Sequence, residues 1–584
     1  MSTLKDLMFW KPAVKYHDTK EYEGTLYDWK PGQHILKKDF SVRDIFHPLT
    51  HDILFEKDIK VPMRDGVKLM VDVFRPVDSK EKIPAVIAWS PYGKTSGSSA
   101  RYENLFNFLG LDNKRMSGLQ KFEGPDPDYW TAHGYAVVHP DARGVAHSEG
   151  DAVLIGTQEG RDGADLVEWI AKQPWCNGKV ALSGTSYLTF SQWFIAAEKP
   201  EHLVCIQPTE GLTDGYRDIV TVGGISDYVF ANVLSDNHEG FQQREDVYKE
   251  ILNYPFVNHP VWEDKIAKVE NIEIPVYMVA SYSNILHTDG TFRAWRNISS
   301  KNKWLRIHDN LEWQDYYEPQ YVEERRKFFD YYLKGIDNGW DKTPIVRYTL
   351  HDMEGNNKVN LVDTQFPPSG TKYKKFYLNG LSRLMTDTPA QNDVPASYDS
   401  KGTTPQLSFH FTVNKETDFI GYPKAHLYLE ADGSDDMDIF VFIQKLDKQL
   451  NVLSQYTMPS RNPRILDALE LHGGVLKYSG AYAKLRVSRR HIDSKKSTDI
   501  IPVQSYDRIE KLLPGQVVEV ELALSPMGIK LYEGETIRFM ISAVNHNGNV
   551  HPGVSGYPGD NSGKHIIHCG GQYASYVQLG ILGK

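Results

Sequence analysis

The 584-residue sequence predicts an α/β domain with a doubly wound parallel sheet, interrupted by one insertion and followed by an all-β sandwich. Three observations predict this class. Short apolar runs bounded by Gly and Pro alternate with amphipathic helical segments before residue 346. That alternation is broken over residues 212–271. From residue 346 onward, short alternating strands are separated by turns, which is typical of a sandwich.

The strands of the α/β domain are expected where apolar runs are short and continuous. "VKLMVDVFRP" (67–76) alternates and ends at Pro76, whereas the later runs each contain a short continuous apolar stretch that ends in a turn. Continuous runs of this length indicate strands that are buried on both faces, as in a parallel sheet. These later runs cover residues 84–93, 134–144, 178–184, 274–283 and 303–310.

Helices are expected between these strands. In "GRDGADLVEWIAKQPW" (160–175), apolar residues recur at helical spacing and Pro174 ends the segment. The run after Ser186 and the amphipathic segment 318–337 predict two more helices. Alternation of strand and helix predicts a doubly wound sheet.

The chain divides into four parts on this interpretation. Residues 1–55 have no clear period and are expected to form an N-terminal arm. The α/β domain takes residues 56–211 and 272–345, and residues 346–584 form the sandwich. The aromatic, Asp/Asn-rich insertion 212–271 is expected to be a helical cap, because the carboxyl edge of a parallel sheet is where ligands bind.

Composition excludes several classes of function. The net charge of −10 is spread without long single-sign blocks, which disfavours nucleic acid or an anionic membrane as a partner. The three cysteines are too sparse for a disulfide framework or a paired metal site. No apolar run approaches the ~18 residues of a membrane helix, and the first residues lack an apolar core of signal-peptide length.

These absences lead to further expectations. We expect a cytoplasmic, reduced protein that binds no metal. We also expect that it needs no cofactor, since the sequence contains no Gly-rich phosphate loop. The amount of apolar β surface is compatible with a homodimer.

The stretch "ALSGTSYLTF" (181–190) carries the candidate chemistry. A buried strand, a tight turn bearing Ser186 and a helix together predict a nucleophile elbow. Such a turn exposes the serine hydroxyl over the sheet edge, and the helix N-terminus adds backbone N–H groups. Gly184 leaves room for close strand–helix packing. The alternative is a serine that merely caps an ordinary helix.

Four motifs occur in an order that resembles the cocaine esterase/X-Pro dipeptidyl-peptidase (CocE/NonD) family of hydrolases. They are "VPMRDGVKLMVDVFRP", "SPYGK", "DARGVAHSEG" and "DLVEWIAKQPWCNGKVALSGTSYLTFSQW". The resemblance covers nearly the whole chain. It implies an α/β-hydrolase fold with a helical cap and a C-terminal jelly-roll. The family's elbow reads G-x-S-Y-x-G, and this chain has Thr189 at the last position.

The resemblance also implies roles for individual residues. Ser186 would be the nucleophile, the Tyr92 hydroxyl would donate to the oxyanion, and the backbone N–H of Tyr187 would be the second donor. Two donors directed at a developing oxyanion each contribute roughly 3 kcal/mol.

The family's acid and base do not match this chain. Ser283 stands where the acid is expected, with Asn284 next, and Glu312 lies nearer the family's histidine than His308 does. Two assemblies remain open. In the first, which we favour, His308 is the base and is oriented by Asn284 or Asp289. In the second, the roles swap between loops, so that His287 is the base and Glu312 the acid.

The sequence therefore predicts a serine hydrolase that cleaves a small-molecule ester or amide through an acyl-enzyme on Ser186. One alternative is an acyltransferase or cyclase that uses the same intermediate. A binding protein with an inactive triad is the other, and the joint presence of Tyr92 and the Ser186 elbow argues against it.

Overall fold

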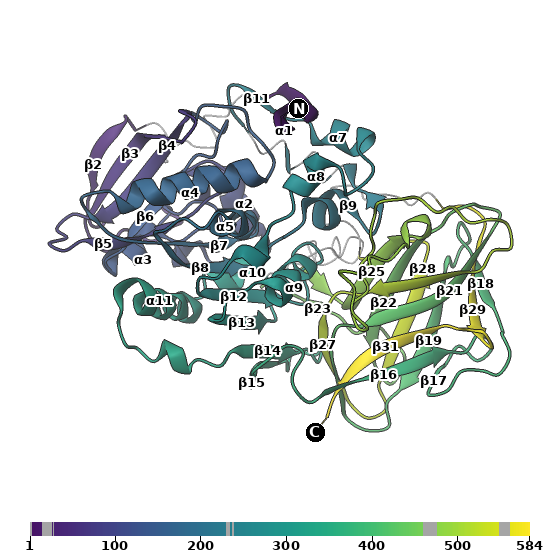
Figure 1. Cartoon of the computed structure of the whole chain (residues 1–584). Helices are drawn as coiled ribbons and strands as arrows, with labels where there is room; N and C mark the ends of the chain where they lie inside the picture. The colour runs from purple at the N-terminus through teal and green to yellow at the C-terminus, as the bar shows by residue number, and fades with distance from the viewer. Residues whose placement is uncertain are drawn as a thin grey trace.

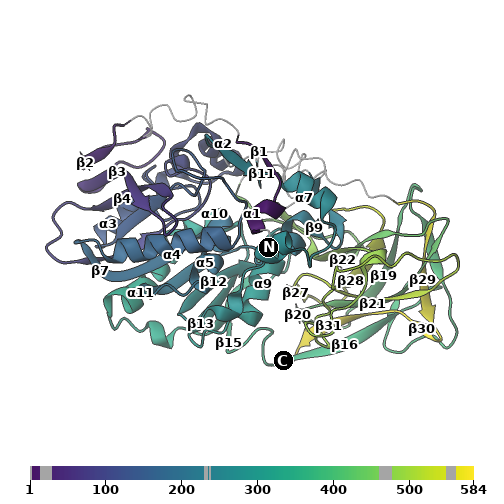
Figure 2. The same cartoon turned by 45° about the horizontal axis from the view of Figure 1, so that its top comes forward.

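The structure is a computed structural model that describes residues 3–13, 26, 29–228, 230, 234–235, 239–459, 476–547 and 561–583. Parts of the expected N-terminal arm, cap and sandwich thus lie outside the described residues. Figure 1 shows two bodies side by side, an α/β domain and a β-sandwich, with short helices above their junction. Figure 2 shows that the N-terminal helix α1 (Leu4–Leu7) lies at this junction.

One large sheet forms the α/β domain. Its strand order is β15-β14-β13-β12-β8-β7-β5-β6-β4-β3-β2. The strands from β6 through β5, β7, β8, β12 and β13 to β14 pair in parallel, and the other pairs are antiparallel. Their bounds are β2 Gly32–Leu36, β3 Ile53–Pro62, β4 Lys68–Pro76, β5 Ile83–Ile87, β6 Ala136–Pro140, β7 Cys176–Thr185, β8 Leu203–Thr209, β12 Val276–Ser281, β13 Lys303–His308, β14 Val346–Leu350 and β15 Lys358–Asp363.

Helices cover both faces of this sheet. Apolar side chains of α4 and α5 share one core with Ala85 and Ile87 of β5. Those of α3 and α11 share another core with Val86 of the same strand. Successive residues of one strand thus face different cores, which confirms the doubly wound α/β class. The helices are α2 Ala100–Leu109, α3 Pro127–Ala132, α4 Thr157–Ala171, α5 Tyr187–Ala197, α9 Thr288–Asn297, α10 Glu312–Tyr316 and α11 Pro319–Lys334.

The insertion is less helical than expected. Its helices are short, and small strand pairs lie between them. One of these strands, β11 (Gln243–Glu245), pairs with β1 (Trp10–Pro12) near the N-terminus. The remaining described elements are the π-helix η5 Tyr216–Val220, β9 Thr221–Val222, β10 Ile225–Ser226, α7 Val247–Asn253, α8 Pro260–Asp264 and η6 Val269–Asn271.

The C-terminal part is a sandwich of antiparallel strands, as predicted. A ten-stranded sheet packs against a four-stranded one. The larger sheet holds β16 Thr371–Leu378, β17 Met385–Thr386, β18 Ala396–Asp399, β20 Thr417–Gly421, β21 Lys424–Asp432, β26 Val518–Ala523, β27 Met527–Leu531, β29 Lys564–Gly570, β30 Tyr573–Ala574 and β31 Tyr576–Leu582. The smaller holds β19 Gln406–Thr412, β22 Asp438–Leu446, β25 Gly480–Arg486 and β28 Thr536–Ser542, and β23 Gln455–Tyr456 pairs with β24 Lys477–Tyr478.

Two expected boundaries differ from the structure. Strands β14 and β15 lie within the expected sandwich range, from residue 346 onward, but extend the large sheet, so the sandwich begins after residue 363. Strands β2 and the start of β3 lie within residues 1–55 and form the opposite edge of that sheet. Alternating strands look the same in sequence whichever sheet they join, so the sequence alone did not separate them.

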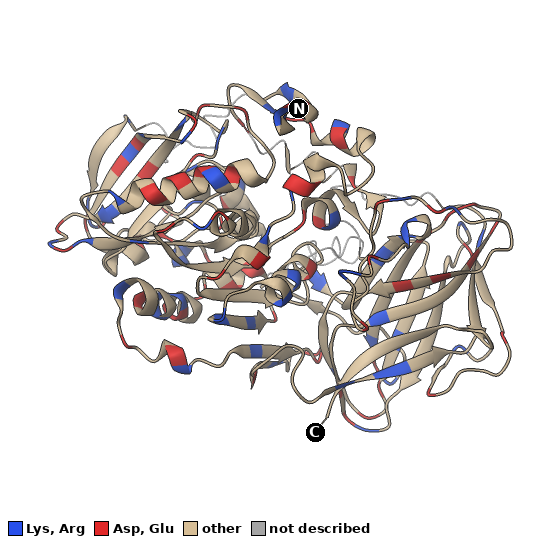
Figure 3. Ribbon diagram, in the orientation of Figure 1, with Lys and Arg blue, Asp and Glu red and all other residues tan. Residues whose placement is uncertain are grey.

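Charges of both signs are interspersed over both bodies in Figure 3. Within the described part of the chain, no helix is both long enough and apolar enough to cross a membrane.

Candidate active site

Ser186 occupies the turn between β7 and α5, at the carboxyl edge of the sheet. It is the N-cap of α5, and its φ of 59° and ψ of −117° are strained for a residue other than glycine. Its backbone N–H donates to the carbonyl of Glu210 (2.8 Å), which fixes the turn. A Cβ at Gly184 would overlap Leu188 of the helix, so glycine permits the close strand–helix approach. This is the geometry of a nucleophile elbow.

Thr189 is accommodated by a glycine from another loop. Its hydroxyl lies 2.7 Å from the carbonyl of Thr209 and accepts the N–H of the same residue at 2.8 Å. A Cβ at Gly211 would overlap the Thr189 methyl group. Gly211 thus provides the space that a side chain at position 189 needs.

The histidine beside Ser186 is His287. Its Nε2 lies 3.1 Å from the Ser186 Oγ. His308, which the sequence favoured, instead places Nε2 at 2.6 Å from Oε1 of Glu210. The structure thus corrects the first assembly and brings together the residues of the second. His287 is the N-cap of α9 and follows β12, whereas His308 ends β13.

Asn284 contacts the other ring nitrogen of His287, and the contact fixes the resting tautomer. The Asn284 Oδ1 accepts the backbone N–H groups of Leu286 (3.1 Å) and His287 (3.3 Å). Its amide nitrogen therefore faces Nδ1 of His287 at 2.9 Å. Since that NH₂ group can only donate, Nδ1 carries no proton here and Nε2 does. Asn284 in this orientation cannot stabilise an imidazolium.

Two carboxylates can take that role. Oε2 of Glu210 lies 3.8 Å from Nδ1 of His287, and Oε1 of Glu312 lies 3.9 Å from it. The Glu312 position agrees with the swapped assembly. Glu210, which directly follows β8, was missed by the sequence reasoning. The signal for it was an acidic residue at the carboxyl end of a buried strand next to the nucleophile strand.

Glu210 and His308 form a buried ion pair. Burial alone would raise the pKa of Glu210, but the positive charge of the adjoining His308 and the proximity of His287 lower that pKa to about 2. Burial likewise opposes charge on His308, yet Asp315 and Glu210 raise its pKa to about 9. Glu210 is therefore ionised and His308 is a cation at neutral pH.

Glu312 titrates near neutrality. Burial and the negative charge of Glu210 raise its pKa to about 7, although His287 acts in the opposite direction. Its proton thus changes within the physiological pH range.

Tyr92 follows β5 and faces the elbow. Burial and the neighbouring Glu123 raise its pKa well above the usual range, so its hydroxyl stays protonated and can donate. The neighbouring Ser186 side chain acts in the opposite direction and lowers this pKa. The backbone N–H of Tyr187 belongs to the first turn of α5, where N–H groups point out of the helix N-terminus. Both expected oxyanion donors thus lie at the elbow.

Two buried lysines hold the turn that carries Tyr92. Nζ of Lys121 donates to the carbonyls of Ser90 (2.8 Å) and Pro140 (2.6 Å). The backbone N–H of Lys94 donates to Asp141 at 2.9 Å, and its Nζ pairs with Asp58 at 2.6 Å. Nothing in the sequence pattern indicated these contacts, because each lysine bonds groups that are distant in the chain.

Asp289 does not join the histidines. It is exposed on the first turn of α9 and makes no hydrogen bond or ion pair with His287 or His308 in the described structure. No group of three or more His, Cys, Asp or Glu in the described residues is arranged to hold a metal ion.

Comparisons with known proteins agree with this geometry. Residues 65–249 match the X-Pro dipeptidyl-peptidase (S15 family) profile, and residues 338–578 match the X-Pro dipeptidyl-peptidase C-terminal non-catalytic domain. A crystal structure of a CocE/NonD family hydrolase from Staphylococcus aureus is 30% identical, with a TM-score of 0.86 over 98% of this chain and 99% of that one.

Similarity to curated relatives is more local. Cocaine esterase from a Rhodococcus species is 34% identical over 160 residues, which cover 27% of this chain and 24% of that protein. The Xaa-Pro dipeptidyl-peptidase of Lactobacillus delbrueckii subsp. lactis is 25% identical over 193 residues, covering 26% of this chain and 24% of that one. The chain thus matches about a quarter of the length of each.

Proposed function

Because the chain belongs to the CocE/NonD family of hydrolases and is a serine hydrolase, we propose that it cleaves an ester or amide bond through an acyl-enzyme on Ser186. The observation that carries this proposal is the 3.1 Å contact between the Ser186 Oγ and Nε2 of His287 at a strained elbow. A serine needs a base within hydrogen-bond reach to act as a nucleophile.

In the proposed acylation step, His287 acts as the general base. The reactive tautomer carries its proton on Nδ1, directed at Glu312 or Glu210, so that Nε2 can accept the Ser186 proton. The Ser186 Oγ then bonds to the substrate carbonyl carbon. The imidazolium gives its proton to the leaving alcohol or amine as the carbonyl re-forms.

Negative charge develops on the carbonyl oxygen during this step. We assign its stabilisation to the Tyr92 hydroxyl and the Tyr187 backbone N–H. Each donor of this kind contributes roughly 3 kcal/mol of barrier reduction. Water, deprotonated by His287, then attacks the acyl-enzyme and releases the acid.

The relatives supply two substrate classes for assay, esters and Xaa-Pro peptides. Turnover of p-nitrophenyl esters and of Xaa-Pro p-nitroanilides should be measured for the wild type and for Ser186→Ala. The proposal requires that at least one substrate is turned over by the wild type and that Ser186→Ala loses this activity. Inactivity on both classes, with the fold intact, would favour the binding-protein alternative.

Acyl transfer uses the same intermediate and is separated from hydrolysis by the product. Methanol or hydroxylamine added to the ester assay competes with water for the acyl-enzyme. A product that remains mainly the free acid supports hydrolysis, whereas a predominant methyl ester or hydroxamate supports the transferase or cyclase alternative.

A further inference from the structure

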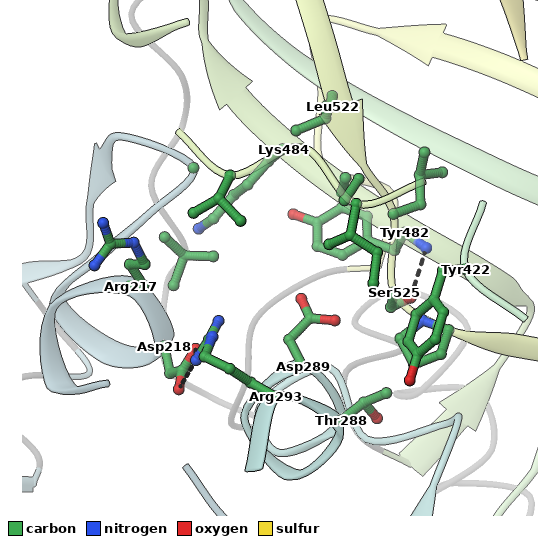
Figure 4. A pocket seen from close by; sticks show the side chains of 18 of the residues that line it. Arg217, Asp218, Thr288, Asp289, Arg293, Tyr422, Tyr482, Lys484, Leu522 and Ser525 are labelled. Carbon is green, nitrogen blue, oxygen red and sulfur yellow. Dashed lines mark hydrogen bonds and ion pairs between the residues drawn. The ribbon is translucent and has the colours of Figure 1, made fainter. Parts of the chain in front are cut away.

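A cavity lies where the insertion, α9 and the sandwich meet (Figure 4). Its volume is about 160 Å³, and neither Ser186 nor His287 lines it. Its charged and aromatic lining includes Arg217, Asp218, Asp289, Arg293, Tyr422, Tyr482 and Lys484.

The insertion is packed closely onto the sandwich at this cavity. A Cβ at Gly223 would overlap the Lys484 carbonyl, and one at Gly224 would lie 2.7 Å from Arg489. The Gly223 carbonyl also accepts the N–H of Arg486 at 2.8 Å. The β9–β10 turn is therefore held against β25, and the cavity is part of a packed interface.

Two of the lining cations are already neutralised by the protein, and a third, Arg296, lies over the ring of Tyr422 at 4.9 Å. Arg217 pairs with Asp214 at 2.7 Å, and Arg293 pairs with Asp218 at 2.7 Å. These two ion pairs lie in the wall of the cavity, and their charges are balanced without a ligand.

Asp289 and Lys484 are different, because neither makes a hydrogen bond or ion pair in the part of the chain that the structure describes. The Asp289 carboxylate projects into the middle of the cavity from α9, and Lys484 lies on the sandwich side (Figure 4). The Asp289 side chain is solvent-exposed at this cavity, and desolvation by the walls around it raises its pKa to about 6. Burial also lowers the pKa of Lys484. Each of these two groups is therefore available to pair with a charge of the opposite sign on a ligand.

We propose that this cavity binds a small zwitterion of the amino-acid class, with its ammonium group on Asp289 and its carboxylate on Lys484. The ligand would satisfy both charges at once. Its carbon chain would contact the rings of Tyr422 and Tyr482, which line the same space. The volume is similar to that of an engineered protein cavity of about 150 Å³ that binds benzene, which limits the ligand to roughly the size of a single amino acid.

The site adjoins the catalytic loop without belonging to it. Ile285 and Thr288 line the cavity and flank His287, which caps α9. A ligand there would contact the same helical turn that holds the proposed base. The binding proposal does not depend on the chemistry of Ser186.

The test is calorimetric titration of the full chain carrying Ser186→Ala, so that no ligand is turned over. The ligands are ω-amino acids of increasing length, from glycine to 6-aminohexanoate, with the N-acetyl and methyl ester forms of each. We expect one length to bind best, and both blocked forms of it to bind at least tenfold more weakly.

Single substitutions assign each end of the ligand. Asp289→Asn should remove the preference for the free amine over the N-acetyl form, and Lys484→Met should remove the preference for the free acid over the methyl ester. Glu270→Gln and Lys268→Met, exposed and outside the cavity, should change neither. Thermal unfolding confirms the fold of each variant, and Asp289→Ser is the substitute if Asp289→Asn does not fold.

Two results would overturn the proposal. One is the absence of binding by every ω-amino acid at millimolar concentration. The other is binding that Asp289→Asn and Lys484→Met leave unchanged. Whether Ser186 is catalytic is measured separately, by the turnover of substrates by the wild type. An inactive Ser186 therefore cannot be mistaken for either of these two results.

Discussion

The Ser186 hydroxyl lies 3.1 Å from Nε2 of His287, a residue that follows β12 and not β13. The two strands are parallel neighbours, with Ser281 opposite His308 at their carboxyl ends. Residues just beyond either strand can therefore reach the elbow. In this chain the loop after β12 supplies the histidine, and the carboxylates come from the segments after β8 and β13.

The first prediction separates the two histidines. His287→Ala should slow turnover by roughly 10⁴-fold or more, nearly as much as Ser186→Ala, because residues acting as one unit are not additive. His308→Ala should slow it less and should lower the melting temperature, because it leaves buried Glu210 without its partner. Single-turnover kinetics and thermal unfolding measure both. A large rate loss in His308→Ala with a small one in His287→Ala would reverse our assignment.

The second prediction concerns the pH dependence of the rate. Glu312 has a pKa of about 7 in the folded protein, so it is protonated below that pH and ionised above it. Because only the ionised form stabilises an imidazolium, kcat/KM should rise with pH through about 7. Glu312→Gln should lower the plateau and remove this limb of the profile. If the pH profile of Glu312→Gln is unchanged, then of the two carboxylates only Glu210 stabilises the His287 imidazolium.

The same group makes a prediction about stability. The folded pKa of Glu312 lies above its ordinary value of 4.5, so the folded state holds this proton at pH values where the unfolded state has lost it. Its contribution to stability is thus largest below pH 4.5 and falls as pH rises to about 7. Denaturant unfolding should therefore show Glu312→Gln gaining stability relative to the wild type across that range. Glu263→Gln, exposed on α8, is the control and should show no such trend.

The third prediction tests the oxyanion donor and the lysine that holds its turn. Tyr92→Phe should lower turnover by roughly 10²–10³-fold, as expected for one preorganised donor. Lys121→Met removes the hydrogen bonds to the Ser90 and Pro140 carbonyls, so it should lower the rate when Tyr92 is present. In the Tyr92→Phe background it should add little, because the donor that it positions is gone.

A matched control distinguishes this positioning role from a general loss of stability. Lys445 of the sandwich strand β22 is also buried, and it donates to the carbonyl of Asp352, in the loop between β14 and β15, at 2.8 Å. Lys445→Met should lower the melting temperature without changing the rate in either background. Equal rate losses from Lys121→Met with and without Tyr92 would contradict the positioning role.

The fourth prediction concerns the packing behind the elbow. Gly211→Ala places a methyl group onto Thr189, which should destabilise the fold by roughly 1–3 kcal/mol. In a Thr189→Gly background the same change should cost less, since the overlapping side chain is absent. Denaturant unfolding of the wild type, the two single variants and the double variant measures the coupling between positions 189 and 211. If the two changes in unfolding free energy are strictly additive, the two side chains do not share the space.

The features that the sequence predicted well are encoded locally. The elbow at Ser186 needs only a strand, a turn and a helix in succession, and the alternation of such units predicts the α/β class, which the structure confirms. The four ordered motifs identified the family, which the similar solved structure confirms.

The features that it predicted poorly depend on which distant segments meet. Strands β14 and β15 read as sandwich strands, because an alternating pattern does not reveal the sheet it joins. The preference for His308 followed its position after β13, whereas three-dimensional packing places that ring against Glu210. Glu210 itself follows β8 and carries no motif, so only the fold brings it to His287.

The acyl-enzyme on Ser186 is tested most directly by mass spectrometry after brief reaction with a fluorophosphonate or with a slowly deacylating p-nitrophenyl ester. Our account predicts one adduct per chain, mapped by peptide digestion to the segment that contains Ser186. Labelling should be lost in Ser186→Ala and nearly lost in His287→Ala. The absence of any adduct, or an adduct on a residue other than Ser186, would contradict it.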